Sequence, residues 1–151
     1  MIRVELTTVI ARPIEDVFAH LIDLPGYARW MPRLALFRRS DVTSAGPMGA
    51  GTRYDDKTWM GIYRGEVVEF RAPTTLVFRE TLRWLGRRVA EARPAYRLVS
   101  TEAGTEVHHV GEGEFYGIFR LMTPIGAWIA RGERRRTMRA LRRALEQGRG
   151  V

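Results

Sequence analysis

The stretch "ARPIEDVFAHLIDLPGYARWMPRL" (residues 11–34) contains two helix signals in succession, and it decides the fold that we expect. Pro13 fits the first position of a helix, and Glu15 and Asp16 follow in the first turn, where the helix dipole favours carboxylates. Apolar side chains then recur at helical spacing and give the helix one apolar face: Ile14, Val17, Phe18, Leu21 and Ile22. The motif "DLPG" ends this helix, and "YARWM" predicts a second short helical turn before Pro32.

On both sides of this stretch the apolar residues recur with a period of two, which is typical of strands. Residues 2–11 alternate Val4, Leu6 and Thr8 with charged or polar residues. After the helices, six further runs are each bounded by a turn signal: 33–42, 52–59, 62–70, 74–84, 87–99 and 105–116. Their short links predict an antiparallel meander, and a last helix is predicted over about 121–147.

The order β-α-α-β6-α predicts an α+β fold with a seven-stranded curved antiparallel sheet, two short helices and a long C-terminal helix. The sheet must cover its apolar face, and a helix of about 27 residues, roughly 40 Å long, can lie across it. One helix cannot fill a whole concave face, so we expect a cavity between sheet and helix. The 151 residues contain no linker or internal repeat, and a single domain, 1–151, is expected.

The composition excludes several kinds of chemistry. The chain has no cysteine, so a disulfide, a thiolate zinc site and a thiol nucleophile are ruled out. The first residues lack the apolar core of a signal peptide, and no window reaches the roughly 18 to 20 apolar residues of a membrane span. A cytoplasmic location is therefore expected. The histidines lack carboxylates at ligand spacing, so no metal site is predicted, and no motif indicates a cofactor.

The net charge of +8 is carried almost entirely by arginine, since Lys57 is the only lysine. Such a bias indicates either a surface for anionic partners or the codon usage of a GC-rich genome, which we favour. The excess is concentrated in residues 131–149, which contain eight arginines and two glutamates. The alternatives there are an ordinary solvated helix face and a docking patch for an acidic partner, an anionic lipid or nucleic acid. No nucleic-acid partner is expected, and the chain would be a monomer or a homodimer.

Several motifs, in order along nearly the whole chain, resemble one family: "ARPIEDVFAHLIDLPGYARWMP" (11–32), "GAGTRY" (49–54), "GEVVEFRAPTTLVFRE" (65–80), "YRLVSTEAGTEV" (96–107) and "LRRALE" (141–146). The pattern is similar to the START-like (SRPBCC) superfamily, and most resembles its polyketide cyclase/dehydrase-like group of small bacterial proteins. The resemblance implies a helix-grip fold enclosing an elongated apolar pocket for lipids, sterols, polyketides or other hydrophobic molecules. It also implies that the second short helix, with Trp30, lies at the pocket mouth.

The run 74–84 supplies the first candidate site residues. Phe78, Glu80 and Trp84 share one side of this strand, which we expect to face inward because most of its side chains are apolar. A carboxyl group buried among apolar neighbours has a raised pKa, as a general acid or base near neutrality requires. The alternative is that Glu80 lies in solvent or pairs with an arginine.

The run 105–116 places His109 on the inward side and His108 on the outward side. His109 is therefore a candidate proton shuttle or hydrogen-bond donor, although a structural histidine is the favoured alternative. His20 follows Asp16 by one helical turn, and we expect a surface pair between them.

In the run 52–59, Tyr54, Asp56 and Thr58 share one side of the strand. If that side faced inward, they would form a row of hydrogen-bonding side chains. Trp59 lies on the other side and also favours burial, so the register stays open. In the last helix, Arg134 interrupts the apolar stripe, and it either reaches out to solvent or projects into the cavity to bind an anionic or enolate oxygen.

Glycines make room inside this helix at positions 126 and 132, and we expect Gly132 to lie close to its inner side. The resemblance adds Arg71 in "FRAP" (70–73), because aromatase/cyclase members have an arginine in this setting that contacts the polyketide.

The sequence therefore predicts a protein that binds a hydrophobic small molecule. Two functions remain open. One is a cofactor-free polyketide cyclase or dehydratase, in which Glu80 or His109 moves a proton while Arg71, Arg134 or Tyr54 holds a ligand oxygen. The other is a non-catalytic carrier of lipid-like molecules.

Overall fold

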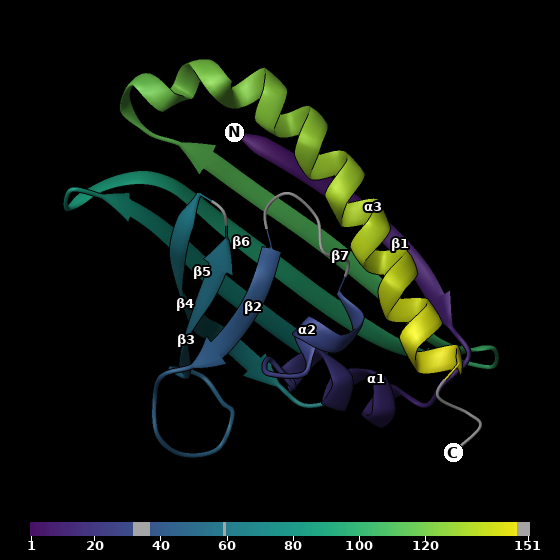
Figure 1. Ribbon diagram of the computed structural model, residues 1–151. Helices are drawn as coiled ribbons and strands as arrows, with labels where there is room; N and C mark the ends of the chain where they lie inside the picture. Colours follow the sequence, from purple (N-terminus) through teal and green to yellow (C-terminus); the bar gives the residue numbers. More distant parts are fainter. Residues whose placement is uncertain (32–36, 59, 148–151) are drawn as a thin grey trace.

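The computed structural model describes residues 1–31, 37–58 and 60–147 (Figure 1). Its elements follow the predicted order: β1 (Ile2–Ile10), α1 (Ile14–Ile22), α2 (Tyr27–Trp30), β2 (Phe37–Val42), β3 (Arg53–Thr58), β4 (Gly61–Arg71), β5 (Thr75–Trp84), β6 (Arg87–Thr101), β7 (Gly104–Phe115), the 3-10 helix η1 (Gly117–Met122) and α3 (Thr123–Gln147). The predicted fold class is confirmed. Pro32, Trp59 and the start of the second predicted strand lie outside the described residues.

The strands form one antiparallel sheet in the order β1-β7-β6-β5-β4-β3-β2. Strands β2 to β7 are consecutive neighbours, as expected for a meander, whereas the first strand of the chain pairs with the last one. In that pairing Ile2 lies opposite Gly113 and Leu6 lies opposite His109. Figure 1 shows the sheet curving so that the helices lie in front of its concave face, with α3 running alongside β1.

The core lies where the helices meet the concave face, and its buried side chains include Val17, Phe18 and Leu21 of α1. The long helix α3 contributes only from its C-terminal part, since its buried residues are Thr137, Met138, Leu141 and Leu145. The first half of α3 has no buried residue, so the hydrophobic core does not extend beneath it.

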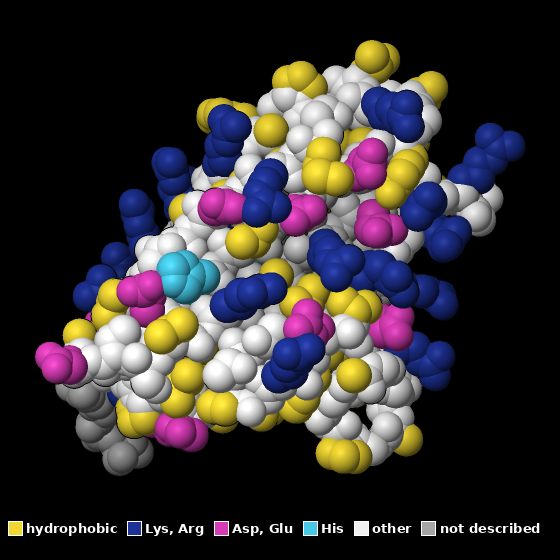
Figure 2. Space-filling view, turned by 180° about the vertical axis from the view of Figure 1, so that it is seen from behind, with side chains coloured by type: hydrophobic (Ala, Val, Ile, Leu, Met, Phe, Trp, Pro, Cys, Tyr) yellow, Lys and Arg dark blue, Asp and Glu magenta, His cyan; other side chains and the backbone are white. Residues whose placement is uncertain are grey.

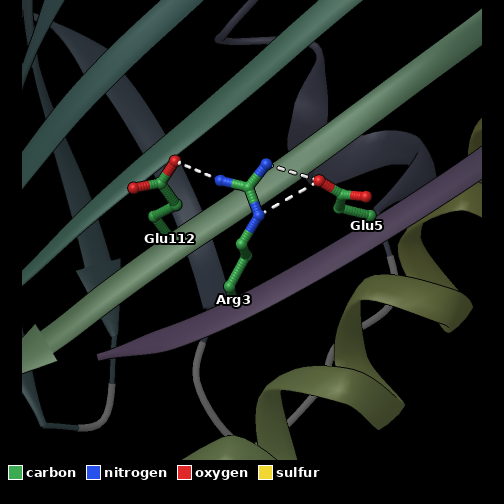
Figure 3. Close-up of polar contacts among 3 residues, drawn as sticks. All are labelled: Arg3, Glu5 and Glu112. Carbon is green, nitrogen blue, oxygen red and sulfur yellow. Dashed lines mark hydrogen bonds and ion pairs between the residues drawn. The ribbon is translucent and has the colours of Figure 1, made fainter.

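The back of the sheet is a mixed charged surface. Figure 2 shows basic and acidic side chains interspersed over it. Arg3 on β1, for example, lies between Glu5 and Glu112, and its Nη1 is 2.8 Å from Glu112 Oε1 (Figure 3). Arg79 and Glu66 form a similar cross-strand pair at 3.1 Å. Exposed pairs of this kind contribute little stability, but they balance the charge of this face locally.

Candidate ligand-binding cavity

A cavity of about 280 Å³ lies between the concave face of the sheet and the first half of α3. Most of its lining side chains are apolar or aromatic, among them Leu24, Phe78 and Ile129. Met122 and Ile125 also line it, and they are 40% and 60% exposed. The cavity therefore reaches the surface beside the start of α3.

Small residues keep this space open. Gly111 and Gly113 of β7 and Gly126 of α3 all line the cavity. A Cβ atom at Gly126 would lie 2.6 Å from the Phe115 ring, so no larger residue fits there without a shift. The expectation for Gly132 is wrong, because it is exposed and a Cβ atom there would meet nothing within 4 Å.

Among the polar residues that line the cavity, four interact with one another, and we call them the polar cluster: Tyr54, Asp56, Glu80 and Arg134. The register that the sequence left open is resolved, because Tyr54, Asp56 and Thr58 all line the cavity from β3. Tyr54 lies opposite Gly65 on β4, and Gly65 lies opposite Glu80 on β5. The Tyr54 ring crosses Gly65 and its hydroxyl donates a hydrogen bond of 2.7 Å to Glu80 Oε1.

The Asp56 carboxyl is the second acid of the cluster, and the Ser40 hydroxyl donates a hydrogen bond to it. Desolvation and the neighbouring Glu80 carboxylate raise the pKa of Asp56 well above its usual range, while the Ser40 hydrogen bond and Arg134 oppose this rise. Two carboxyls this close cannot readily both ionise. Asp56 therefore tends to keep a proton, and Glu80 acts as the hydrogen-bond acceptor.

Arg134 reaches the cluster from α3. It is partly buried and lines the cavity, and a Cβ atom at Gly111 would lie 3.6 Å from its Cδ. The absence of a side chain at Gly111 thus leaves room for the arginine stem beneath the helix. With a proton on Asp56, the cluster combines one cation, one carboxylate and two hydroxyl groups, of which the Tyr54 hydroxyl already donates to Glu80.

His109 points inward, as the strand alternation predicts, but it does not line the cavity. Its ring stacks on Tyr96 at 4.4 Å, and its Nδ1 is 3.0 Å from the Ala95 carbonyl oxygen. Burial and the nearby Arg134 lower the pKa of His109 to about 3. The side chain is then neutral near pH 7, which does not favour a proton-shuttle role.

Three further predicted site residues lie outside the cavity lining. Trp84 lies beyond a register shift between Leu82 and Arg83, is 40% exposed and donates a hydrogen bond to the Met60 carbonyl. Arg71 is exposed at the end of β4, 3.6 Å from Glu69.

Trp30, the third of them, packs against Tyr27 and His20. The surface pair expected for His20 is wrong, because Asp16 pairs with Arg12 at 2.8 Å and the His20 ring packs on Trp30 at 5.2 Å instead.

Sequence analysis missed several cavity residues. Tyr27 lines the cavity from α2, and its buried hydroxyl donates a hydrogen bond to the Leu21 carbonyl. Tyr63 lines it from β4, and burial raises the pKa of Tyr63 to about 12. The alternation of Tyr63, Gly65 and Val67 along β4 carries this signal, since it places all three on the inward side.

Comparison with known proteins places this geometry among related folds. A family model described as "Polyketide cyclase / dehydrase and lipid transport" matches residues 1–146. Protein MLL2253 from Mesorhizobium loti has a similar structure, with a TM-score of 0.71 at 16% identity over 99% of this chain and 98% of that one. The Aha1 dimer from Colwellia psychrerythraea gives 0.67 at 17% identity, over 99% of this chain and 100% of that one.

The di-domain ARO/CYC StfQ from the steffimycin biosynthetic pathway gives a TM-score of 0.68 at 13% identity, over 99% of this chain and 52% of that one. At these identities the structures confirm the fold alone. No curated protein matches the sequence. Within the described residues, no group of three or more histidine or acidic residues is placed to hold a metal ion, and no helix is long and apolar enough to cross a membrane.

The close contact of Tyr54 with Gly65 predicts that Gly65→Ala disrupts the cluster. The new Cβ atom would lie 2.2 Å from Tyr54 Cζ, so the ring must leave its place above the strand. We expect the free energy of unfolding in urea to fall by about 1 to 3 kcal/mol. Gly113→Ala is the matched control, because its Cβ atom would have no neighbour nearer than 3.7 Å. Equal stability of the two variants would contradict this packing.

The raised pKa of Asp56 predicts a pH-dependent effect of Asp56→Asn. The unfolded chain releases this proton at about pH 4, whereas the folded protein keeps it to higher pH. The wild type therefore loses stability as pH rises from about 4 through the pKa of Asp56 in the folded protein. Asparagine does not titrate. Relative to the wild type, the free energy of unfolding of the variant in urea should therefore rise by about 1 kcal/mol or more between pH 4.5 and pH 8.

The control for this effect is Asp55→Asn, which changes the neighbouring carboxyl outside the cavity lining. A stability difference between Asp56→Asn and the wild type that is the same at both pH values would show that the Asp56 proton is not retained on folding.

Proposed function

Because the chain belongs to the polyketide cyclase / dehydrase and lipid transport family, we propose that it binds a hydrophobic small molecule in the cavity. The apolar walls enclose the body of the ligand, and the polar cluster holds an oxygen-bearing end. The observation that carries this proposal is the lining itself, in which apolar side chains surround one group of convergent polar ones.

The position of the polar cluster along the cavity supports an elongated ligand. The cavity meets the surface at Met122, and Arg134 lies 12 residues further along η1 and α3. At 1.5 Å per residue this is roughly 18 Å. The ligand would enter with its polar end first and leave its apolar end near the mouth.

The volume indicates the size class of the ligand. About 280 Å³ is at the lower end of the range for small-molecule pockets. Spread along roughly 18 Å, this volume favours one slender hydrophobic molecule over a lipid with two long acyl chains.

A second candidate function, proton-transfer catalysis, is favoured by the acid pair of Asp56 and Glu80. The Glu80 carboxylate would remove a proton from a carbon between two carbonyl groups of a poly-β-carbonyl substrate. The resulting enolate forms a carbon–carbon bond to another carbonyl carbon, whose C=O π bond breaks, and Asp56 gives its proton to the alkoxide oxygen formed there. Arg134 would stabilise the negative charge on these oxygens. The protons balance, and no cofactor is needed.

The binding proposal predicts that a carbonyl oxygen on the ligand raises its affinity for the protein by accepting a hydrogen bond from Arg134. We suggest 2-acetylnaphthalene and 2-ethylnaphthalene as probes, because they share a carbon skeleton and differ in one carbonyl oxygen. The ketone should bind the wild type several-fold more tightly, as expected for about 1 kcal/mol from one hydrogen bond. Arg134→Met should reduce this difference, and Arg135→Met on the outer side of α3 should not.

Mass spectrometry of the freshly purified protein, first native and then denaturing, tests the same proposal without a chosen probe. A retained hydrophobic molecule would support it. Equal affinity for both probes would contradict the role of the cluster, and a clean apo mass with no binding of either probe would contradict the binding function.

Turnover separates the two candidate functions. With a poly-β-carbonyl substrate, an enzyme should lose activity in Glu80→Gln and retain it in Glu66→Gln, whose carboxylate pairs with Arg79 outside the cavity. A carrier should show no turnover in any of these proteins.

A further inference from the structure

The start of the last helical segment exposes large apolar side chains. Ile118, Leu121, Ile125 and Trp128 are 79%, 86%, 60% and 76% exposed, and we call these four residues the apolar helix face. They are spaced by three, four and three residues, so they lie on one side of η1 and the first turns of α3. Figure 2 shows hydrophobic side chains gathered at the upper edge of the molecule, where this segment lies.

Single exposed apolar residues are common, but four neighbouring ones mark an interaction site. The apolar helix face is also continuous with the cavity mouth, because Ile125 belongs to both and Met122 lies next to it. Whatever covers this face therefore also covers the entrance to the cavity.

The same side of α3 becomes cationic further along. Arg136, Arg139 and Arg143 follow Ile125 by 11, 14 and 18 residues, which are close to whole numbers of helical turns. All three are exposed, and within the described part of the chain none of them forms an ion pair. One side of a single helix thus presents an apolar half followed by a cationic half.

We propose that this side of η1 and α3 docks on an anionic membrane surface. The apolar helix face enters the interfacial layer, where an amphipathic ring such as that of Trp128 is favoured, and the arginines lie over the lipid headgroups. This inference goes beyond the proposed function and does not depend on it. If the cavity does hold a hydrophobic molecule, docking lets that molecule pass between bilayer and cavity without crossing water.

A second copy of the chain fits this surface less well. In a two-fold dimer, parallel helices would bring the arginines of both copies together, and such like-charge contacts are costly. Antiparallel helices that pair through the apolar helix face would leave the arginines without a partner. Nucleic acid would use the arginines and leave the apolar helix face in water, since its affinity comes mainly from phosphate contacts. Only an anionic surface with an apolar interior matches both halves.

Co-sedimentation with lipid vesicles tests the proposal on the full chain. The wild type should bind vesicles of phosphatidylcholine and phosphatidylglycerol, bind pure phosphatidylcholine more weakly, and lose affinity as salt rises. The double variant Leu121→Ser/Trp128→Ser should bind the anionic vesicles about tenfold more weakly or worse. Val99→Ser is the matched control, because it removes an apolar side chain that is 52% exposed on β6.

The arginines are tested separately. Arg136→Gln/Arg139→Gln should weaken binding to anionic vesicles several-fold and reduce its salt dependence. Arg93→Gln/Arg97→Gln, which changes two exposed arginines on β6, should do neither. Neither Leu121 nor Trp128 lines the cavity, so affinity for the naphthalene probes without vesicles should stay unchanged. This keeps a failure of docking distinct from a failure of ligand binding.

The proposal is overturned if the wild-type protein does not co-sediment with anionic vesicles. It is also overturned by a wild type that is dimeric by light scattering, together with a Leu121→Ser/Trp128→Ser variant that is monomeric and binds vesicles as well as the wild type. Thermal unfolding at the wild-type temperature would show that the variant is folded, since substitutions of exposed side chains have small effects on stability.

Discussion

One long helix and two short ones have to cover a curved sheet of seven strands, and the rest of the structure depends on this mismatch of shape. The last turns of α3 pack into the core through Leu141 and Leu145, and its first half contributes no buried side chain. The cavity occupies the space that remains, and it is lined there by glycine and alanine, which cannot fill it. The pocket is thus the space that the inner side of this segment leaves unfilled.

The polar cluster lowers the stability of the folded protein, so folding alone does not explain its presence. An apolar residue in place of Asp56 would avoid desolvating a carboxyl group beside a second acid. Tyr54 reaches Glu80 only because Gly65 has no side chain on the strand between them. Groups that oppose stability yet are arranged this closely are typical of functional sites.

The fold could be predicted because its signals are local: alternation, turn residues and helical spacing each need only a short window of sequence. Alternation also places Phe78 and Glu80 correctly on the inward side of β5. It fails for Trp84, which lies past a register shift at the strand end. The closeness of Asp56 and Glu80 could not be predicted either, because it depends on the register of three strands, and the burial depth of His109 depends on the stacking of Tyr96.

The pairing of β1 with β7 affects how the protein folds during its synthesis. Ile2 pairs with Gly113, so β1 leaves the ribosome well before the strand with which it pairs. At typical rates of synthesis this wait is roughly 5 to 20 s, during which the apolar side of β1 has no sheet to join. The strands from β2 to β7 can meanwhile pair in sequence with their neighbours. The pairing of β1 with β7 is therefore a long-range and late event, and β1 is exposed to aggregation until it occurs.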